Sequence, residues 1–362
     1  MRILHLSDRL SDHGGADHHL RDVLAHQVLR HRVSLAYGRA DPGARLPAGV
    51  RGVRVRGLGS PISSEAGLEE LGGLMAGADV VHLHNVMNPE AIRRAVATGR
   101  AIVTIQDHRV FCPGPGKTLP GGSACTSPMG SACEACLPEP EYRQRLLALT
   151  AERAAALQGA RLIALSSYMA RAIADAKIGD SHVIPPWLAS SGRPARAGMG
   201  WLLAGRMVAH KAPTLAWQAW LKSGSRHPLR VAGAGPLVEQ LAGAEAVGWL
   251  PRATFRAAAR ASRALLFPAQ WQEPFGIAGL EALAEGTPVI ATVRGGMGDW
   301  ASAGCLAVEA EPAAMAEAIQ RLERDPALAE RLGAGGWEQV RAKFRREILA
   351  PKLDALVESV AG

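Results

Sequence analysis

The sequence predicts two α/β domains, each built on an open parallel sheet. Short β-branched or apolar runs alternate with Ala-, Leu- and Arg-rich stretches of helical period, a pattern typical of βαβ units. The pattern occurs in two blocks, separated by a Gly-, Pro- and Arg-rich stretch from Ser190 to Gly200. A length of 362 residues also fits two domains of ordinary size. We therefore expect one domain on each side of this linker.

The first block is expected over residues 1–190 and alternates strands with helices. The expected strands are Arg2–Ser7, Val33–Tyr37, Val80–His84, Ala101–Gln106 and Arg161–Leu165. The expected helices are Asp17–Leu29, Pro89–Ala97, Glu139–Ala156 and Ser167–Ala176. Because a helix lies between successive strands, each helix is a crossover and the sheet is expected to be parallel.

The second block is expected over residues 191–345 and follows the same rule. The expected strands, with helices between them, are Trp201–Gly205, Leu229–Gly233, Ala244–Trp249, Ala264–Phe267, Pro288–Thr292 and Cys305–Val308. Two further helices are expected at Pro312–Arg324 and Ala327–Phe344. The last segment, Arg346–Ala361, has apolar residues at helical spacing and predicts an amphipathic helix. In open sheets of this kind, ligands bind at the carboxyl ends of the strands, here in a cleft expected between the domains.

The positive charge of the chain is spread evenly. The formal net charge is +8, and residues 1–190 and 191–362 each contribute +4 without a basic tail or block. This distribution excludes a nucleic-acid-binding arm and leaves at most a weak attraction to an anionic membrane. The apolar start of the chain is too short for a signal peptide, and no apolar run is long enough for a membrane span. We expect a cytoplasmic protein, at most peripheral at the inner face of the membrane.

A loop and helix after the Ala264–Phe267 strand concentrate the polar chemistry. A helix is expected to begin near Gly276, so Glu273 and the backbone N–H groups of Phe275 and Gly276 lie at its N-terminus. Free N–H groups and the helix dipole favour an anion or sugar hydroxyls there. Glu281, about a turn and a half into the helix, reaches the same edge. The alternative is an ordinary polar loop followed by a surface carboxylate.

Two further segments offer phosphate-binding chemistry. Arg206 and Lys211 follow a strand end, where two cations neutralise a diphosphate, Arg as a planar fork and Lys as a point charge. Gly14 and Gly15 allow the backbone to approach a phosphate at the start of a helix. Taken singly, the two cations are more typical of a solvated surface than of a phosphate site, and a Gly pair is more often only a turn.

The stretch from Trp271 to Ile290 resembles the E-x7-E signature of glycosyltransferase family 4, which comprises retaining enzymes of the GT-B fold. Other segments resemble the pattern of that family in the expected order. They are Gly14-Gly15, Val81-His82-Leu83-His84, Gly205-Arg206 with Lys211, Gly233-Ala234-Gly235-Pro236 and Gly295-Gly296. The resemblance extends over nearly the whole chain. It implies two Rossmann-like domains facing a central cleft, with the helix over residues 346–362 packing back on the first domain.

The resemblance also implies roles for these residues. Arg206 and Lys211 hold the diphosphate of the donor, and Glu281 holds its ribose hydroxyls. Glu273, with the amides of Phe275 and Gly276, holds the donor sugar, and Gly14 and Gly15 also face the donor. The resemblance also implies a front-face route in which the departing phosphate oxygen accepts the proton of the acceptor. This route requires no metal ion, so no cofactor is expected for catalysis.

The implied function is transfer of a sugar from a nucleotide-diphosphate sugar to a hydroxyl of a glycan, lipid-linked or small-molecule acceptor. Two alternatives remain open: an epimerase or hydrolase of nucleotide sugars, and a non-catalytic protein that binds them. The sequence names neither the sugar nor the acceptor.

The sequence departs from the family at two positions. The family commonly has His-Asp after the fifth strand, and the matching pair here is Gln106-Asp107. Glutamine exchanges hydrogen bonds but never becomes cationic, and His108 replaces the missing imidazole only if the loop is rearranged. With His84, the pair Gln106-Asp107 is expected on the side of the donor sugar and acceptor. The Gly295–Asp299 segment also lacks the usual Glu.

Four cysteines cluster in a Gly-, Pro- and Ser-rich loop over residues 108–138. They are Cys112, Cys125, Cys133 and Cys136, a C-x12-C-x7-C-x2-C spacing. This spacing favours structural zinc with four thiolate ligands, or an iron–sulfur cluster. Free thiols are an alternative, as are two disulfides, which a cytosolic location disfavours. Some family members are similar here, with Cys-Pro shortly after His-Asp.

Two other groups of possible ligands have simpler interpretations. His13, His18 and His19 with Asp17 are expected to form a solvated helix face rather than a second metal site. Cys305 lies in an apolar strand and is expected in the core.

Overall fold

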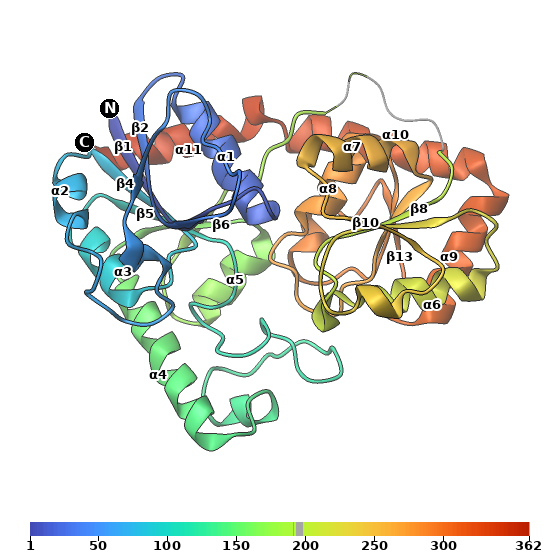
Figure 1. Cartoon of the computed structure of the whole chain (residues 1–362), viewed down its shortest axis with the longest axis horizontal. Coiled ribbons are helices and arrows are strands. Elements are labelled where there is room, and N and C mark those ends of the chain that lie inside the picture. Colours follow the sequence, from blue (N-terminus) through green and yellow to red (C-terminus); the bar gives the residue numbers. More distant parts are fainter. Residues whose placement is uncertain (191, 193–197, 362) are drawn as a thin grey trace. The chain divides into compact units, whose positions relative to one another are not determined.

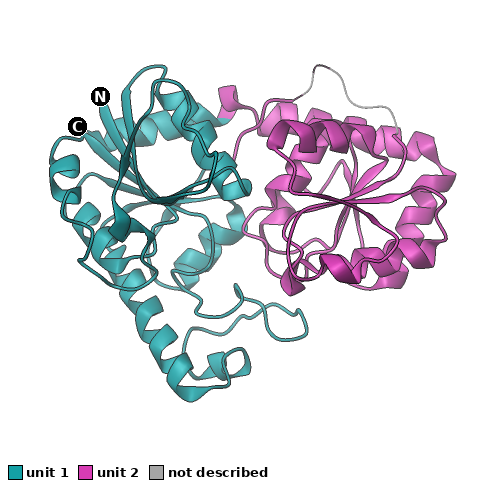
Figure 2. Ribbon diagram, viewed as in Figure 1, with its two compact units in different colours: residues 1–185, 349–362 teal, residues 186–348 magenta. Residues whose placement is uncertain are grey.

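The computed structural model of the chain describes residues 1–190, 192 and 198–361, so most of the expected linker lies outside the described residues. Its backbone divides into two compact units (Figure 2). Unit 1 contains residues 1–185 and 349–362, and unit 2 contains residues 186–348. The chain therefore crosses between the units twice, the second time within its last helix.

Unit 1 is built on a seven-stranded sheet whose strands all pair in parallel (Figure 1). The order across the sheet is β3-β2-β1-β4-β5-β6-β7. The strands are β1 (Arg2–Leu10), β2 (Arg32–Ala40), β3 (Arg51–Arg54), β4 (Val80–His84), β5 (Ala101–Ile105), β6 (Arg161–Ala164) and β7 (Ser181–Val183). Strand order reverses between β1 and β4, which places the ligand-binding switch point of such a sheet at their carboxyl ends.

Five helices accompany this sheet, and a sixth returns from the end of the chain. They are α1 (Gly15–Gln27), α2 (Leu71–Ala76), α3 (Pro89–Val96), α4 (Pro140–Ala156), α5 (Ser167–Asp175) and α11 (Arg346–Ala361). Short 3-10 turns are η1 (Arg56–Gly59) and η2 (Ser131–Ala135). Leu353, Leu356 and Val357 of α11 are buried, and Asp354 lies 2.9 Å from the ring of His26 on α1. These contacts attach α11 to unit 1.

The two faces of this sheet differ in chemistry because side chains alternate along each strand. Leu4 and Leu6 of β1 and Val81 and Leu83 of β4 belong to a large apolar core that also includes residues of α2, α3 and α5. The intervening residues of the same strands point to the opposite face. There β4 carries His82 and His84, which are buried.

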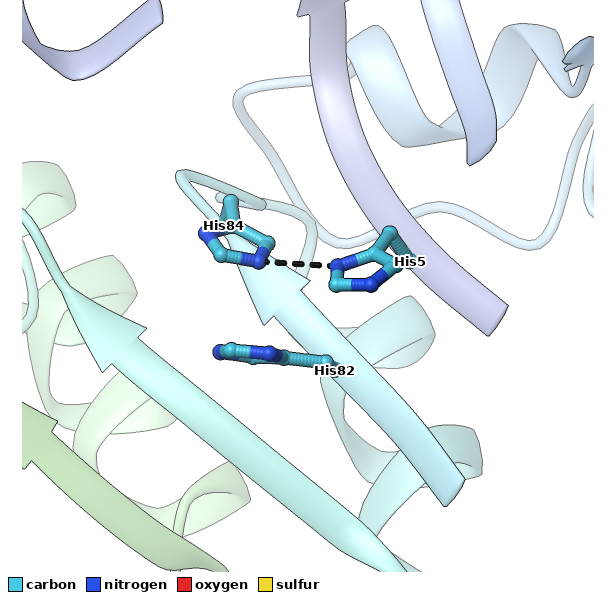
Figure 3. Close-up of side chains that lie close together, drawn as sticks. All are labelled: His5, His82 and His84. Carbon is cyan, nitrogen blue, oxygen red and sulfur yellow. Dashed lines mark hydrogen bonds between the residues drawn. The ribbon is translucent and has the colours of Figure 1, made fainter. Parts of the chain in front are cut away.

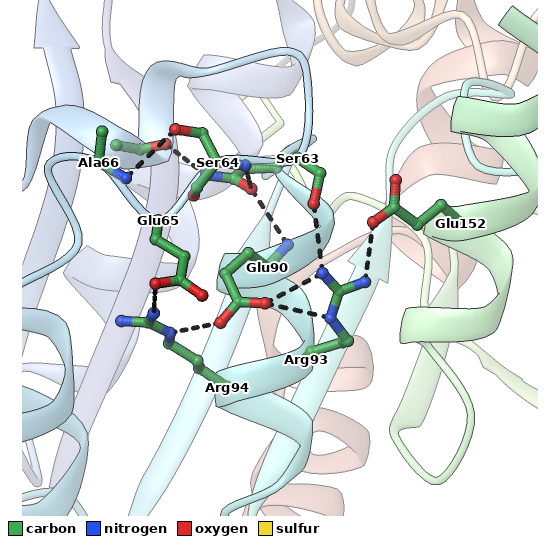
Figure 4. A network of polar contacts seen from close by, with 10 residues as sticks. Ser63, Ser64, Glu65, Ala66, Glu90, Arg93, Arg94 and Glu152 are labelled. Carbon is green, nitrogen blue, oxygen red and sulfur yellow. Dashed lines mark hydrogen bonds and ion pairs between the residues drawn. The ribbon is translucent and has the colours of Figure 1, made fainter. Parts of the chain in front are cut away.

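A charged network ties three surface segments of unit 1 together (Figure 4). Glu90 of α3 contacts both Arg93 and Arg94, and Arg93 extends to Glu152 of α4 at 2.9 Å. Arg93 also donates to the Ser63 hydroxyl in the loop after η1. Exposed ion pairs stabilise little singly, but a network orients the loop and both helices.

Unit 2 is built on a six-stranded sheet, again with parallel pairs throughout. The order is β10-β9-β8-β11-β12-β13. The strands are β8 (Trp201–Ala204), β9 (Leu229–Ala232), β10 (Glu245–Gly248), β11 (Ala264–Phe267), β12 (Val289–Ala291) and β13 (Cys305–Ala307). The longer helices are α6 (Pro213–Ser223), α7 (Arg252–Ala261), α8 (Ile277–Ala284), α9 (Pro312–Arg324) and α10 (Pro326–Lys343).

Short turns complete unit 2. The turns are η3 (Ala209–Lys211), η4 (Val238–Gln240) and η5 (Gly295–Asp299).

Two details of the fold differ from the sequence expectation. Cys305 was expected in the core but is only partly buried, because β13 is an edge strand. In unit 1, the expected elements omitted β3, β7 and α2, which are short and carry no sustained apolar pattern. Within the described part of the chain, no helix combines the length and apolarity needed to cross a membrane.

Candidate functional site

The polar site of unit 2 forms where β8 and β11 end. These strands are neighbours and parallel, so the segments that follow them meet at one edge of the sheet. The Lys211 ammonium, after β8, forms an ion pair with Glu273 Oε1, after β11. The Glu273 side chain is 4% exposed and that of Lys211 is 22% exposed. Two predicted site residues therefore meet in a partly dry environment, where a charge interaction is strong.

Aromatic rings surround this ion pair. The Lys211 nitrogen lies 4.8 Å from the centre of the Trp271 ring and 5.9 Å from that of Phe267. The His210 ring lies 4.8 Å from the same Trp271 ring. Cation–π contact and an opposite charge both hold the ammonium at a defined position.

His210 connects Arg206 to this group. Burial, followed by the charges of Arg206 and Lys211, lowers the pKa of His210 to about 4. Its ring is therefore neutral near pH 7, and Nε2, 3.4 Å from Arg206 Nη2, offers a lone pair to the guanidinium. His210 is a site residue that the sequence analysis missed, although its place beside Lys211 was a signal.

The loop before α8 presents unpaired backbone donors. Among the described residues, no acceptor contacts the N–H groups of Phe275 and Gly276. Gly276 caps α8 with φ of 85°, a conformation that favours glycine. The carbonyl of Phe275 accepts a 2.6 Å hydrogen bond from Trp300 Nε1, and its ring is buried. The loop is thus fixed from behind while its donors remain available.

The glycine pair after β12 supports Glu273 from the backbone. Gly296 N–H donates to the Glu273 carbonyl at 2.6 Å. A Cβ atom on Gly295 would lie 2.5 Å from that carbonyl oxygen, and the φ of Gly295 is 59°. Only glycine allows this close approach without displacing one of the two loops.

Glu281 is buried in α8 and held by a partner. Arg252, the first residue of α7, contacts Glu281 Oε1 through Nε at 2.5 Å. The Glu281 carboxylate is therefore oriented by a fork-shaped cation. Arg252 could not be identified from the sequence, because a contact across 29 residues has no local signature.

The turn after β9 fixes the strand end that carries Arg206. A Cβ atom on Gly233 would lie 1.8 Å from the Gly205 carbonyl oxygen, so the two segments touch through their backbones. Met207 N–H also donates to the Ala234 carbonyl at 2.8 Å. This turn therefore positions the segment before Lys211. It is not the glycine motif of a dinucleotide-binding site.

In unit 1, the predicted residues lie at the carboxyl ends of β1, β4 and β5. Gly14 caps α1, which begins at Gly15. Gln106 Nε2 lies 3.5 Å from the Ala16 carbonyl. Asp107 forms a 2.7 Å ion pair with Arg109, and this cation lowers the pKa of Asp107 even though burial opposes ionisation.

His108 and His84 are both turned into the protein. His108 Nε2 lies 3.1 Å from the Tyr168 hydroxyl, and the residue is buried. His84 Nε2 lies 3.1 Å from His5 Nδ1 and is likewise buried. Both rings are therefore held by partners inside unit 1.

The prediction of a solvated helix face at the start of α1 is wrong for two of its residues. Asp17 and His19 are buried, and Asp17 forms a 2.7 Å ion pair with Arg9. His13 does lie near the surface, 3.4 Å from Asp41. The burial of Asp17 was not predicted because its partner, Arg9, lies in the last part of β1, beyond the expected end of this strand.

The four clustered cysteines share one neighbourhood. Burial and the nearby Cys112, Cys125 and Cys133 raise the pKa of the Cys136 thiol. Lys117 N–H donates to Cys112 Sγ at 3.2 Å. Throughout the described ranges, however, the compact group of potential ligands is His5, His82 and His84, and it includes no cysteine. Metal binding by the cysteines therefore stays a prediction.

Comparisons with known proteins concern both units. Residues 201–339 match the family model described as Glycosyl transferases group 1. The chain is 28% identical over 180 residues to a glycogen synthase of Mycobacterium tuberculosis (strain CDC 1551 / Oshkosh), covering 45% of this chain. It spans only 43% of the length of that relative.

Solved structures resemble the chain over almost its whole length. Sucrose-phosphate synthase from Thermosynechococcus elongatus is 20% identical, with a TM-score of 0.73 and coverage of 99% of this chain and 98% of that one. Anabaena Alr3699/HepE in complex with UDP-glucose is 15% identical, with a TM-score of 0.72 and coverage of 99% and 100%. WaaG, a glycosyltransferase of lipopolysaccharide biosynthesis, is 16% identical, with a TM-score of 0.66 and coverage of 98% and 99%. The chain thus has the two parallel-sheet domains of GT-B glycosyltransferase structures, and its residues 201–339 match the Glycosyl transferases group 1 model.

Proposed function

We propose that this protein is a retaining glycosyltransferase that moves a sugar from a nucleotide-diphosphate sugar to an acceptor hydroxyl. The observation that carries the proposal is the Lys211–Glu273 ion pair beside the unpaired amides of Phe275 and Gly276. It lies within the segment that matches the glycosyltransferase group 1 model. Anabaena HepE, a structural neighbour, was solved with UDP and with UDP-glucose, so UDP-glucose is the first donor to test.

Unit 2 holds the donor in this proposal. Arg206 and Lys211 bind the diphosphate, and neutral His210 orients the Arg206 fork toward it. Glu273 and the two loop amides exchange hydrogen bonds with the sugar hydroxyls. Glu281, held by Arg252, accepts hydrogen bonds from the ribose. The two cations offset the negative charge that accumulates on the leaving diphosphate.

The chemical step needs no protein base. The bond between the anomeric carbon and the diphosphate oxygen breaks while the acceptor oxygen attacks from the same face. The departing oxygen takes the acceptor proton, and the anomeric configuration is retained. Unit 1 binds the acceptor, with Gln106 and Asp107 on the side of the sugar. The acceptor is a glycan, a lipid-linked glycan or a small molecule.

The Gln106-Asp107 pair favours one alternative, a protein that binds nucleotide sugars without turnover. Gln106 lacks the charge that an imidazolium would bring, and His108 is held by Tyr168. A third outcome, hydrolysis or epimerisation, requires donor but no acceptor.

The test incubates the protein with UDP-glucose and other nucleotide sugars, with and without a panel of soluble and lipid-linked glycan acceptors. Acceptor-dependent release of nucleoside diphosphate, with an α-linked product from an α-linked donor, supports the proposal. Release without acceptor supports a hydrolase or epimerase, and binding without release supports a sensor. The Lys211→Ala variant must lose the activity, whereas Lys222→Ala, an exposed lysine on α6, must keep it.

A further inference from the structure

Three buried histidines gather at the centre of the unit 1 sheet (Figure 3). β1 and β4 are paired so that His5 lies beside His82, and His84 follows two residues later on the same face. All three residues are at most 1% exposed. Their ring nitrogens include one from each residue that all lie within 4.8 Å of one another. Rigid neighbouring strands thus bring three imidazoles together without any loop.

Two of the rings are held from outside by hydrogen-bond partners. His5 Nε2 lies 2.7 Å from Gln27 Oε1 on α1, and His82 Nε2 lies 2.8 Å from the Thr104 hydroxyl on β5. The Gln27 oxygen accepts only, so His5 carries its proton on Nε2 and keeps a lone pair on Nδ1. Such outer partners are what orient imidazoles that ligate a metal.

Two ring nitrogens of the cluster lack partners. Nδ1 of His82 and Nδ1 of His84 are buried and have no hydrogen-bond partner among the described residues. A buried polar atom without a partner destabilises the folded state. His84 Nε2 lies 3.1 Å from His5 Nδ1, close to the separation of about 3.3 Å for two nitrogens bound tetrahedrally to zinc. One pair of nitrogens therefore already has the spacing that a zinc ion uses, and a ligand atom of His82 lies within 4.8 Å of both.

We propose that His5, His82 and His84 bind a zinc ion inside unit 1, independently of the glycosyl-transfer site in unit 2. His5 contributes Nδ1 and His84 contributes Nε2, which exchange their mutual hydrogen bond for bonds to the ion. The proton that His84 Nε2 donates in that hydrogen bond moves to Nδ1 of the same ring, so that Nε2 has a free lone pair. His82 contributes Nδ1, its nitrogen without a partner. The ion stabilises unit 1 by joining β1 to β4.

Protonation does not compete with the ion near pH 7. Burial lowers the pKa of His5 to about 4. Burial and the neighbouring imidazoles lower the pKa of His82 and His84 well below the usual range. Neutral imidazole is the form that ligates metals, and it suits zinc and its first-row neighbours rather than magnesium or calcium.

His19 on α1 offers a fourth imidazole to this site. Its ring is buried and lies edge-on to His84, with 6.4 Å between the ring centres. A shift of this side chain would complete the four-coordinate shell of a structural zinc site.

The experiment measures zinc bound by the full-length protein, using mass spectrometry for content and Zn²⁺ titration for affinity. We expect one equivalent that survives in a variant with Ser at all four clustered cysteines, Cys112, Cys125, Cys133 and Cys136. We expect His82→Gln to lose it and Gln27→Leu to weaken it about 10–100-fold. His182→Gln, at an exposed position on β7, is the matched control and must bind as wild type.

Two measurements keep the result clear if His82→Gln folds poorly. Added Zn²⁺ must raise the Tm of the variant with Ser at all four clustered cysteines above its value in chelator. Co²⁺ bound to the same variant must give visible ligand-field bands, which that variant with His82→Gln must lose. No bound zinc with an unchanged Tm overturns the proposal, as does zinc that follows the cysteines instead of the histidines. Because these readouts need no donor or acceptor, they are independent of the proposed transferase activity.

Discussion

Lys211 and Glu273 are separated by 62 residues in the sequence, yet their side chains form an ion pair at one edge of the unit 2 sheet. The pair exists because β8 and β11 are adjacent and parallel, so the turns after them converge. Glu273 is the more buried partner, and the Lys211 ammonium compensates its buried negative charge. The two charges neutralise each other. A bound diphosphate would weaken this ion pair, because the anion competes with Glu273 for the same ammonium.

Removing the Lys211 ammonium should lower turnover much more than donor binding. We expect Lys211→Ala to reduce kcat about 100-fold or more, the scale seen when one stabilising donor is removed from a transition state. Steady-state release of nucleoside diphosphate at saturating donor measures this effect. Lys222→Ala has the same change of charge at an exposed position of unit 2 and should leave kcat within twofold. Equal kcat values for the two variants would remove Lys211 from the diphosphate site.

Glu281 should affect donor binding more than turnover. If Glu281 accepts hydrogen bonds from the ribose, Glu281→Ala removes contacts that are the same in ground and transition states. We expect a donor Kd about tenfold higher, measured calorimetrically, with kcat changed less. Arg252→Ala should shift the Kd in the same direction, because Arg252 orients the carboxylate. A loss confined to kcat would contradict the ribose assignment.

Local patterns in the sequence predicted the strands with sustained apolar runs, and these agree with the structure within a few residues at their ends. Short edge strands escaped prediction because β3 and β7 have too little apolar surface to be distinguished from loops. Lys211 and Glu273 were each predicted to follow a strand end, but the ion pair between them was not predicted.

Contacts that depend on register could not be found in this way. His5 and His82 look like isolated histidines in apolar strands until the pairing of β1 with β4 sets them side by side. The Arg252 contact to Glu281 likewise requires α7 to pack beside α8. The support of Glu273 by Gly295 depends on two loops approaching through their backbones.

Gly295 should be intolerant of any side chain, although it is no ligand itself. Its φ of 59° and a predicted 2.5 Å approach of a Cβ atom to the Glu273 carbonyl both oppose substitution. We expect Gly295→Ala to displace Glu273, lower kcat at least tenfold and reduce the free energy of unfolding by about 1–3 kcal/mol. Gly298→Ala is the matched control in the same turn, since a Cβ atom there meets nothing within 4 Å. Similar losses in both variants would mean that the turn merely tolerates substitution poorly.

His210 should make the protein sensitive to acid. Its pKa is about 4 in the folded state and about 6.5 when unfolded, because burial, Arg206 and Lys211 oppose its charge while Glu273 favours it. Between these values the unfolded state binds the extra proton, so stability is full above pH 6.5 and falls as the pH drops toward 4.

The replacement His210→Gln keeps a hydrogen-bond acceptor for Arg206 but removes this titration. Urea unfolding at several pH values between 4.5 and 6 should therefore show a free energy of unfolding that depends less on pH, by at most one proton, because solvent screens the charges around this partly exposed ring. The buried histidines of unit 1 are present in both the wild type and the variant. When the two units unfold together, their contribution to the pH dependence of unfolding is therefore the same in both proteins and cancels in the comparison. His182→Gln changes an exposed ring and should leave the pH dependence unaltered. If His210→Gln also leaves it unaltered, the ring is protonated in the folded protein and cannot accept a hydrogen bond from Arg206.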